Sequence, residues 1–232
     1  MADRGIIFST PMVLAPLADR KTQTRRLAKP QGGTRWWQEN TPSGKAAWFT
    51  DVRHKFGIQS MLHNGYFVGQ HLYVRENLRA TELMESGRDG IRYEADGSWK
   101  PIDNLPSAGI AWLKLFSYGK KTAEENGLHF EKRGPIVPAI HCPRWASRLT
   151  LVVTAVAVHR LQDISREDCV AEGHPRAEAD YPEEVHLDAA RDWYMDLWDS
   201  LHTKPGDRWK DNPFVVAVSF SVHRLNIDRM PI

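Results

Sequence analysis

Two runs of β-branched and small apolar residues, 148–160 and 214–222, constrain the fold of this chain most. In 148–160, apolar residues occupy both alternating positions, which is typical of a strand that is buried on both sides. The run 214–222 predicts a closing strand. Further short strands are predicted at 5–9 and 71–74, so strands lie towards both ends of the sequence. The chain is therefore predicted to be a single α+β domain over residues 1–232.

A cluster of positive charge at residues 17–26 indicates a functional site. It places Lys21 and Thr24 three positions apart among arginines, a grouping that core packing does not need. Like charges this close repel, so the cluster is expected either to bind an anion such as phosphate or to contain a lysine with a lowered pKa. The alternative is a solvated helix end whose charges complement the helix dipole.

Lys21 and Thr24 are expected to act together only in a turn, because residues three apart on a strand point to opposite faces. Thr10 and Pro11 predict the start of a helix, which Pro16 is expected to kink or shorten. We therefore place Lys21 to Thr24 in an irregular turn beyond that helix.

Two helices are predicted in the second half of the chain. Ser165 begins a variant capping box, which predicts a helix that stops at Gly173. Later residues recur at helical spacing and predict a helix that packs by an apolar stripe, namely Trp193, Leu197, Trp198 and Leu201. Residues 80–135, in contrast, have weak periodicity and many glycines and prolines. They are expected to form an irregular surface insertion, able to fold back as a lid.

The composition is that of an ordinary soluble protein. Charged residues make up 26% and the hydrophobic set 41%, and the net charge of +2 gives no sign of nucleic-acid binding by bulk electrostatics. Nine tryptophans are unusual, and several adjoin arginine or lysine. Arg144 and Trp145 are therefore candidates for phosphate contact and base stacking, although a tryptophan more often belongs to the core.

The chain has two cysteines, Cys142 and Cys169, and neither shows metal-ligand spacing. His141 adjoins Cys142 but lacks further ligands, so neither a metal nor another cofactor is expected. No signal peptide is visible, and no apolar stretch is long enough to span a bilayer. We expect a cytoplasmic protein with no membrane partner.

Four stretches, taken in order, resemble a known family. They are 17–26, 68–76, 140–148 and 161–173, and together they are similar to the ASCH family of the PUA-like superfamily, above all to its longer, phage-associated members. The resemblance leaves out most of residues 27–60. It implies a PUA-like β-barrel with flanking helices, an insertion at about 80–135 and, for a phage-encoded protein, location in the host cytoplasm.

The family motif, Gly-x-Lys-x-x-Glu/Thr-x-Arg, falls on Asp19, Lys21, Thr24 and Arg26. Asp19 departs from the glycine, although aspartate tolerates left-handed geometry better than most residues. Threonine at the fourth motif position resembles small bacterial members that hydrolyse N4-acetylcytidine with a lysine, a threonine and a glutamate. Their glutamate corresponds to Glu172 here.

The resemblance implies an amidohydrolase that acts on an N4-acylated cytosine nucleoside. Thr24 is the expected nucleophile, Lys21 its activating base and Glu172 the orienting, proton-shuttling carboxylate. Lys21 can act as a base only when neutral, and burial and nearby arginines would have to lower its pKa. In the competing assignment, Glu172 activates water and Thr24 positions the amide.

Arg26, Arg75, Glu76, Arg144 and Trp145 are the predicted substrate-binding residues. Arg75 and Glu76, at a strand end, are either a surface ion pair or the edge that reads the base. The alternative to an enzyme is a non-catalytic module of PUA-like type that binds RNA, single-stranded nucleic acid or a modified base.

Overall fold

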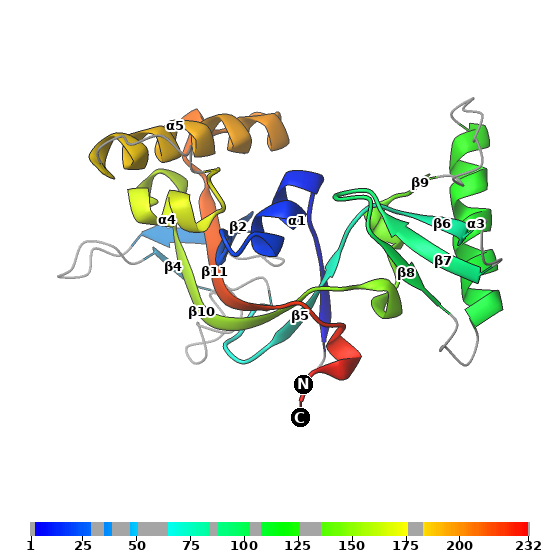
Figure 1. The fold of residues 1–232 in the computed structure, drawn as a ribbon. Helices are drawn as coiled ribbons and strands as arrows, with labels where there is room; N and C mark the ends of the chain where they lie inside the picture. Colours follow the sequence, from blue (N-terminus) through cyan, green and yellow to red (C-terminus); the bar gives the residue numbers. More distant parts are fainter. Residues whose placement is uncertain are drawn as a thin grey trace. The chain divides into compact units, whose positions relative to one another are not determined.

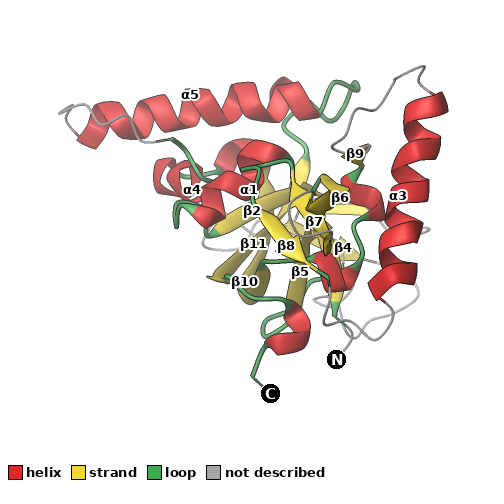
Figure 2. Ribbon diagram, turned by 45° about the vertical axis from the view of Figure 1, so that its right-hand side comes forward, coloured by secondary structure: helices red, strands yellow, loops and turns green. Residues whose placement is uncertain are grey.

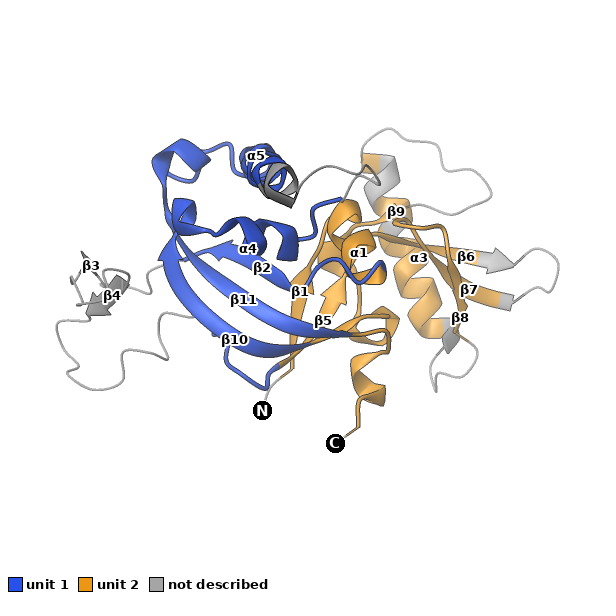
Figure 3. Ribbon diagram, turned by 60° about the vertical axis from the view of Figure 1, so that its left-hand side comes forward, with its two compact units in different colours: residues 1, 18–70, 152–222 blue, residues 2–17, 71–151, 223–232 orange. Residues whose placement is uncertain are grey.

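The computed structural model describes the following parts of the chain: residues 3–28, 65–83, 88–102, 108–125, 136–175 and 183–231, and the backbone of 35–38 and 47–50. The chain divides into two compact units, each made of segments that are far apart in the sequence (Figure 3). Unit 1 comprises residues 18–70 and 152–222, and unit 2 comprises 2–17, 71–151 and 223–232. The single domain over residues 1–232 stays a prediction.

The strands β10, β11 and β2 of unit 1 lie in that order in one sheet. Their bounds are Thr150–Arg160, Phe214–His223 and Gln23–Leu27. β2 runs antiparallel to β11, with Leu27 opposite Val215 and Gln23 opposite Ser219. The positions of the two strands predicted from the β-branched runs are therefore confirmed, but β10 is not buried on both sides, because its residues 154–160 are half-buried or exposed. A separate antiparallel pair is formed by β3 (Arg35–Gln38) and β4 (Ala47–Thr50).

Helices α4 (Arg166–Ala171) and α5 (Glu183–Leu201) lie side by side in unit 1 (Figure 1). Ser165 caps α4 as predicted, because its Oγ accepts a hydrogen bond from the backbone N–H of Asp168 at 3.0 Å. Leu201 is 57% exposed, so the predicted apolar stripe of α5 does not reach its last residue. The rest of the stripe packs in a core that α5 shares with α4, β2 and β11. Its buried residues include Tyr194, Trp198, Cys169 and Val215, and the partly buried Leu27 packs against them.

In unit 2, β1 (Arg4–Ile7) pairs in parallel with β5 (His71–Arg75). Both strands were predicted and are confirmed. The helix α1 (Thr10–Leu17) follows β1 and contains Pro16 in its last turn. It is a short helix, as expected for a segment in which proline removes a backbone donor.

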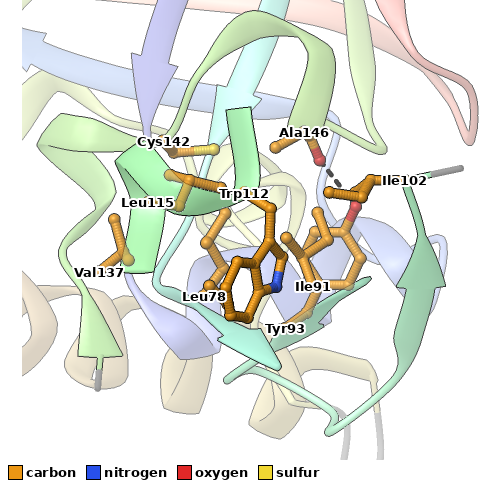
Figure 4. Packing of buried hydrophobic residues seen from close by; sticks show 10 residues of the cluster. Leu78, Ile91, Tyr93, Ile102, Trp112, Leu115, Val137, Cys142 and Ala146 are labelled. Carbon is orange, nitrogen blue, oxygen red and sulfur yellow. Dashed lines mark hydrogen bonds between the residues drawn. The ribbon is translucent and has the colours of Figure 1, made fainter. Parts of the chain in front are cut away.

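The irregular structure predicted for residues 80–135 is wrong. This region holds much of a four-stranded sheet in the order β8-β7-β6-β9, packed against helix α3. The elements are β6 (Leu78–Leu83), β7 (Arg88–Tyr93), β8 (Trp99–Pro101), α3 (Ala108–Glu125) and β9 (Ile136–Val137). Figure 4 shows their core, in which Trp112 of α3 lies among Leu78, Ile91 and Tyr93. Among the described glycines, Gly90 lies inside β7 and Gly109 inside α3, so glycine did not mark irregular structure at these positions.

The α+β class is confirmed, because helices and antiparallel or mixed sheets share the chain (Figure 2). The described strands form open sheets rather than the closed β-barrel implied by the family resemblance. Among the described helices there is no candidate for a membrane-spanning segment.

The N-cap of α4 gives a test of this local structure. Replacing Ser165 with alanine removes the acceptor for the Asp168 N–H, and we expect the free energy of unfolding to fall by about 1 kcal/mol. Urea denaturation measures this change. Ser200→Ala, at another exposed helical serine, is the matched control, and an equal loss in both variants would contradict the capping role.

Candidate functional site

The segment that leads into β2 is extended rather than turned. Asp19 has a left-handed φ of 55°, and the turn ends there. Lys21 forms an isolated antiparallel β-bridge with Glu172, and the strand β2 begins two residues later. The prediction that Lys21 to Thr24 form an irregular turn is therefore wrong: the left-handed turn lies before Lys21, at the position where the family motif has glycine.

Glu172 is held at the end of α4 by backbone geometry. It is the C-cap of the helix, and Gly173 follows it with a φ of 105°, a conformation that favours glycine. Arg20 donates from Nη1 to the carbonyl of Gly173 at 2.9 Å, and the N–H of Thr22 donates to Ala171 O at the same distance. These bonds bring the basic segment alongside the last turn of the helix.

Lys21 and Glu172 form a buried ion pair. The Lys21 Nζ lies 2.7 Å from Oε2 of Glu172 and also donates to the Glu172 backbone carbonyl at 2.7 Å. Lys21 is 0% exposed and Glu172 3%. A buried charge is costly unless it is paired and hydrogen-bonded, and each member of this pair satisfies the other.

Arg25, which lies on β2, contacts the same Glu172 carboxylate. Its Nη1 lies 3.0 Å from Oε1 of Glu172, and its Nη2 lies 2.7 Å from Oδ2 of Asp168, one helical turn earlier on α4. Tyr194 of α5 closes the cluster, with its hydroxyl 3.5 Å from Oε1 of Glu172. The Lys21 cluster, as we name these five residues, thus joins β2, α4 and α5 around one glutamate.

Burial dominates the electrostatics of this cluster. Desolvation lowers the pKa of Lys21, Glu172 opposes that shift, and the positive charges of Arg26 and Arg25 add to it. This is the direction that a role of Lys21 as a base requires. Burial beside Glu172 raises the pKa of Tyr194 well above its usual value, so its hydroxyl keeps its proton. The site therefore combines an amine that loses its proton more readily with a phenol that does not ionise.

Thr24 and Arg26 share one face of β2, while Arg25 points to the other, because side chains alternate along a strand. Thr24 is 2% exposed, and its Oγ1 accepts a hydrogen bond from Arg26 Nη1 at 2.9 Å. Of the three predicted catalytic residues, Lys21 and Glu172 are thus in direct contact. Thr24 lies on the opposite face of this extended segment, beside Arg26, so the structure does not bring it together with the other two.

Arg75 and Glu76, which belong to unit 2, do not form the predicted surface pair with each other. Arg75 donates to the backbone carbonyls of Cys142 and Ile140. Glu76 is buried and takes two hydrogen bonds of 2.8 Å from Arg148. Burial raises the pKa of Glu76, and the Arg148 guanidinium opposes this shift. Both side chains therefore tie segments of unit 2 together.

Arg144 and Trp145, also in unit 2, have structural partners. Arg144 donates to Asp228 at 2.7 Å and to Asp3 at 2.6 Å. Trp145 is partly buried against the core of the four-stranded sheet. In the described part of the chain, no three His, Cys, Asp or Glu side chains gather in a way that would hold a metal ion.

Sequence reasoning missed three members of the cluster. Arg25 is one of the arginines in the basic cluster of residues 17–26, Asp168 follows the predicted cap at Ser165 by three positions, and no sequence pattern singles out Tyr194. The spacing of Asp168 and Glu172 was an available signal, because residues four apart share a helix face. The contact of Tyr194 could not be read from the sequence, since α5 reaches the site only through tertiary packing.

In comparisons with protein-family models, with curated proteins and with solved structures, the chain matches none. The ASCH resemblance therefore stays a prediction. What the site can do chemically follows from the contacts of Lys21, Glu172 and Arg25.

The Lys21–Glu172 contact can be measured by a double-mutant cycle. We expect Glu172→Gln alone to lower the free energy of unfolding by about 3 kcal/mol, because it leaves buried cations without their counter-charge. Adding Lys21→Met should recover part of this loss, with a coupling of about 1–3 kcal/mol in urea denaturation. Additive losses in the double variant would show that the pair is not coupled.

Proposed function

We propose that this protein is an amidohydrolase that removes an acyl group from the N4 amine of an N4-acetylcytidine-like nucleoside. The observation that carries the proposal is the buried contact of Lys21 with Glu172. The motif resemblance singles out these two residues, 151 positions apart in the sequence, and they lie 2.7 Å from each other. A lysine whose pKa is lowered by burial and that contacts a carboxylate is typical of sites that transfer protons.

The reaction assigns one role to each residue. In the route that the motif implies, Thr24 Oγ1 attacks the acyl carbon and the neutral Lys21 amine accepts the hydroxyl proton, which requires the two side chains to meet although they alternate along the extended segment. Glu172 relays the proton from Lys21 to the departing N4 atom, and the C–N bond breaks to release cytidine. Water then cleaves the acyl-threonine ester and yields the free carboxylic acid. Arg26, which donates to Thr24 Oγ1, is placed to stabilise negative charge on that oxygen.

The competing route uses water directly. Here Glu172 removes a proton from water, which attacks the amide, and Glu172 then gives this proton to the departing N4 atom, while Thr24 only positions the amide. The alternation along β2 favours this route, because Thr24 lies beside Arg26 on the face opposite to Arg25, which contacts the glutamate. The two routes differ in one observable, because only the first forms an ester on Thr24.

The PUA-like architecture of the ASCH family is part of this proposal. The α+β class and the contact of motif residue Lys21 with Glu172 support it. The predicted roles of Arg75, Glu76, Arg144 and Trp145 in substrate binding also stay predictions, since each of these side chains has a partner within unit 2.

The proposal is tested with a panel of N4-acylcytidines and detection of cytidine by mass spectrometry. We expect Lys21→Ala, Thr24→Ala and Glu172→Ala each to lower kcat by at least about 100-fold, because each removes a group that transfers a proton or forms the bond. Thr24→Ser should keep much of the activity and accumulate an acyl-enzyme, seen as a mass increase of one acyl group.

Arg166→Ala is the matched control, because Arg166 pairs only with the exposed Asp188 among its described contacts. It should retain wild-type turnover. Full turnover by all three alanine variants would remove the proposal. Salt-dependent retention of oligonucleotides without any product would instead favour a nucleic-acid binding module.

A further inference from the structure

Arg25 lies inside the Lys21 cluster but takes part in none of the proposed chemical steps. Its side chain is 0% exposed and contacts two carboxylates at once, Glu172 at 3.0 Å and Asp168 at 2.7 Å. The Asp168 side chain, on the outer side, is 37% exposed. A planar guanidinium can span two acceptors in a fixed geometry, whereas a lysine ammonium cannot. The contact with two carboxylates therefore fixes the orientation of the Arg25 guanidinium in addition to placing a positive charge beside Glu172.

The two oxygens of Glu172 have different partners. Oε1 faces Arg25 and Oε2 faces Lys21. Resting on the proposed hydrolase function, we propose that Arg25 is a positioning residue, which holds the Glu172 carboxylate so that Oε2 meets the Lys21 amine. Asp168 in turn anchors the second arm of the guanidinium. The order Asp168, Arg25, Glu172, Lys21 thus runs from the surface to the buried amine.

An arginine that served only to attach β2 to α4 would be expected to satisfy all its donors. Arg25 does not: its Nε is buried and has no hydrogen-bond partner within the described residues. An unsatisfied buried donor on a cation destabilises the fold. The orientation of Arg25 is therefore dictated by the two terminal nitrogens and their carboxylates rather than by optimal bonding of the whole side chain.

The charge of Arg25 also acts on Lys21. Arg25 and Arg26 lower the pKa of Lys21, whereas Glu172 raises it. On α5, Tyr194 stays protonated, and on β10 burial lowers the pKa of His159, so that this ring is neutral near pH 7. Asp168 is the remaining charged group of the cluster. Loss of the Arg25 charge should thus raise the pKa of Lys21 and leave less of the neutral amine at pH 7.

The test compares full-length Arg25→Met, Arg25→Lys and Asp168→Asn with the wild type. Two quantities are measured: the pH dependence of kcat and KM on N4-acetylcytidine, and the titration of Lys21 Nζ by NMR in 15N-lysine-labelled protein. For Arg25→Met we expect kcat to fall about 100-fold with little change in KM. The pH below which kcat falls and the pKa of Lys21 should both rise by about 1 pH unit in this variant.

Arg25→Lys keeps the charge but cannot span both carboxylates, so kcat should fall while the acid limb stays in place. Asp168→Asn, which weakens the anchor alone, should give a smaller loss of kcat. Arg191→Met is the matched control, because Arg191 donates to the backbone carbonyls of Ile164 and Gln162 in the same unit. It should leave the pH profile unchanged even where it lowers stability.

The outcomes separate this inference from the proposed function. Absence of hydrolysis by the wild type overturns the proposed function. The Lys21 titration then tests by itself whether Arg25 acts on Lys21. An unchanged titration in Arg25→Met, or losses that match those of Arg191→Met, would overturn the positioning role. If Arg25→Met does not fold, Arg25→Lys tests the positioning role. A wild-type kcat in Arg25→Lys would overturn this role, because it would show that simultaneous contact with Glu172 and Asp168 is not needed.

Discussion

The buried carboxylate of Glu172 is the interaction on which the site of unit 1 depends. Two cations, Lys21 and Arg25, approach it from the strand side, and each is almost completely removed from water. Any one of these charges alone in the interior would be strongly unfavourable, and only their mutual contact makes burial tolerable. The local backbone serves this contact, since the left-handed turn at Asp19 and the helix stop at Gly173 bring the two segments together.

Such a cluster is a poor way to obtain stability alone. Well-packed apolar residues would hold β2 against α4 at a lower desolvation cost, as the neighbouring contact of Leu27 and Val215 with α5 does. A lysine whose pKa is lowered by burial, in contact with a glutamate and a fixed arginine, is instead suited to moving protons. This contrast between the apolar core and the charged cluster is the physical reason for placing function there.

Unit 2 uses charge differently. Its buried Glu76 is matched by Arg148 through two bonds of equal length, and Arg148 also lies over the ring of Tyr93 at 4.1 Å. Arg144 joins two chain-terminal segments through Asp3 and Asp228. In these pairs the arginines link separated segments, whereas in the Lys21 cluster a second cation shares the carboxylate. That difference distinguishes a structural pair from a candidate site.

Local patterns in the sequence predict the α+β class, the strands β10 and β11, the cap of α4 at Ser165 and Lys21 as a candidate site residue. Each of these rests on a local signal: β-branched runs, capping residues or a short motif. Three features emerge only from the folded chain: Arg25, Asp168 and Tyr194 join the site, Lys21 reaches it on an extended segment, and the described parts of residues 80–135 form regular strands and a helix. These features depend on contacts between segments far apart in the chain, and local propensity does not encode which distant partner a side chain meets.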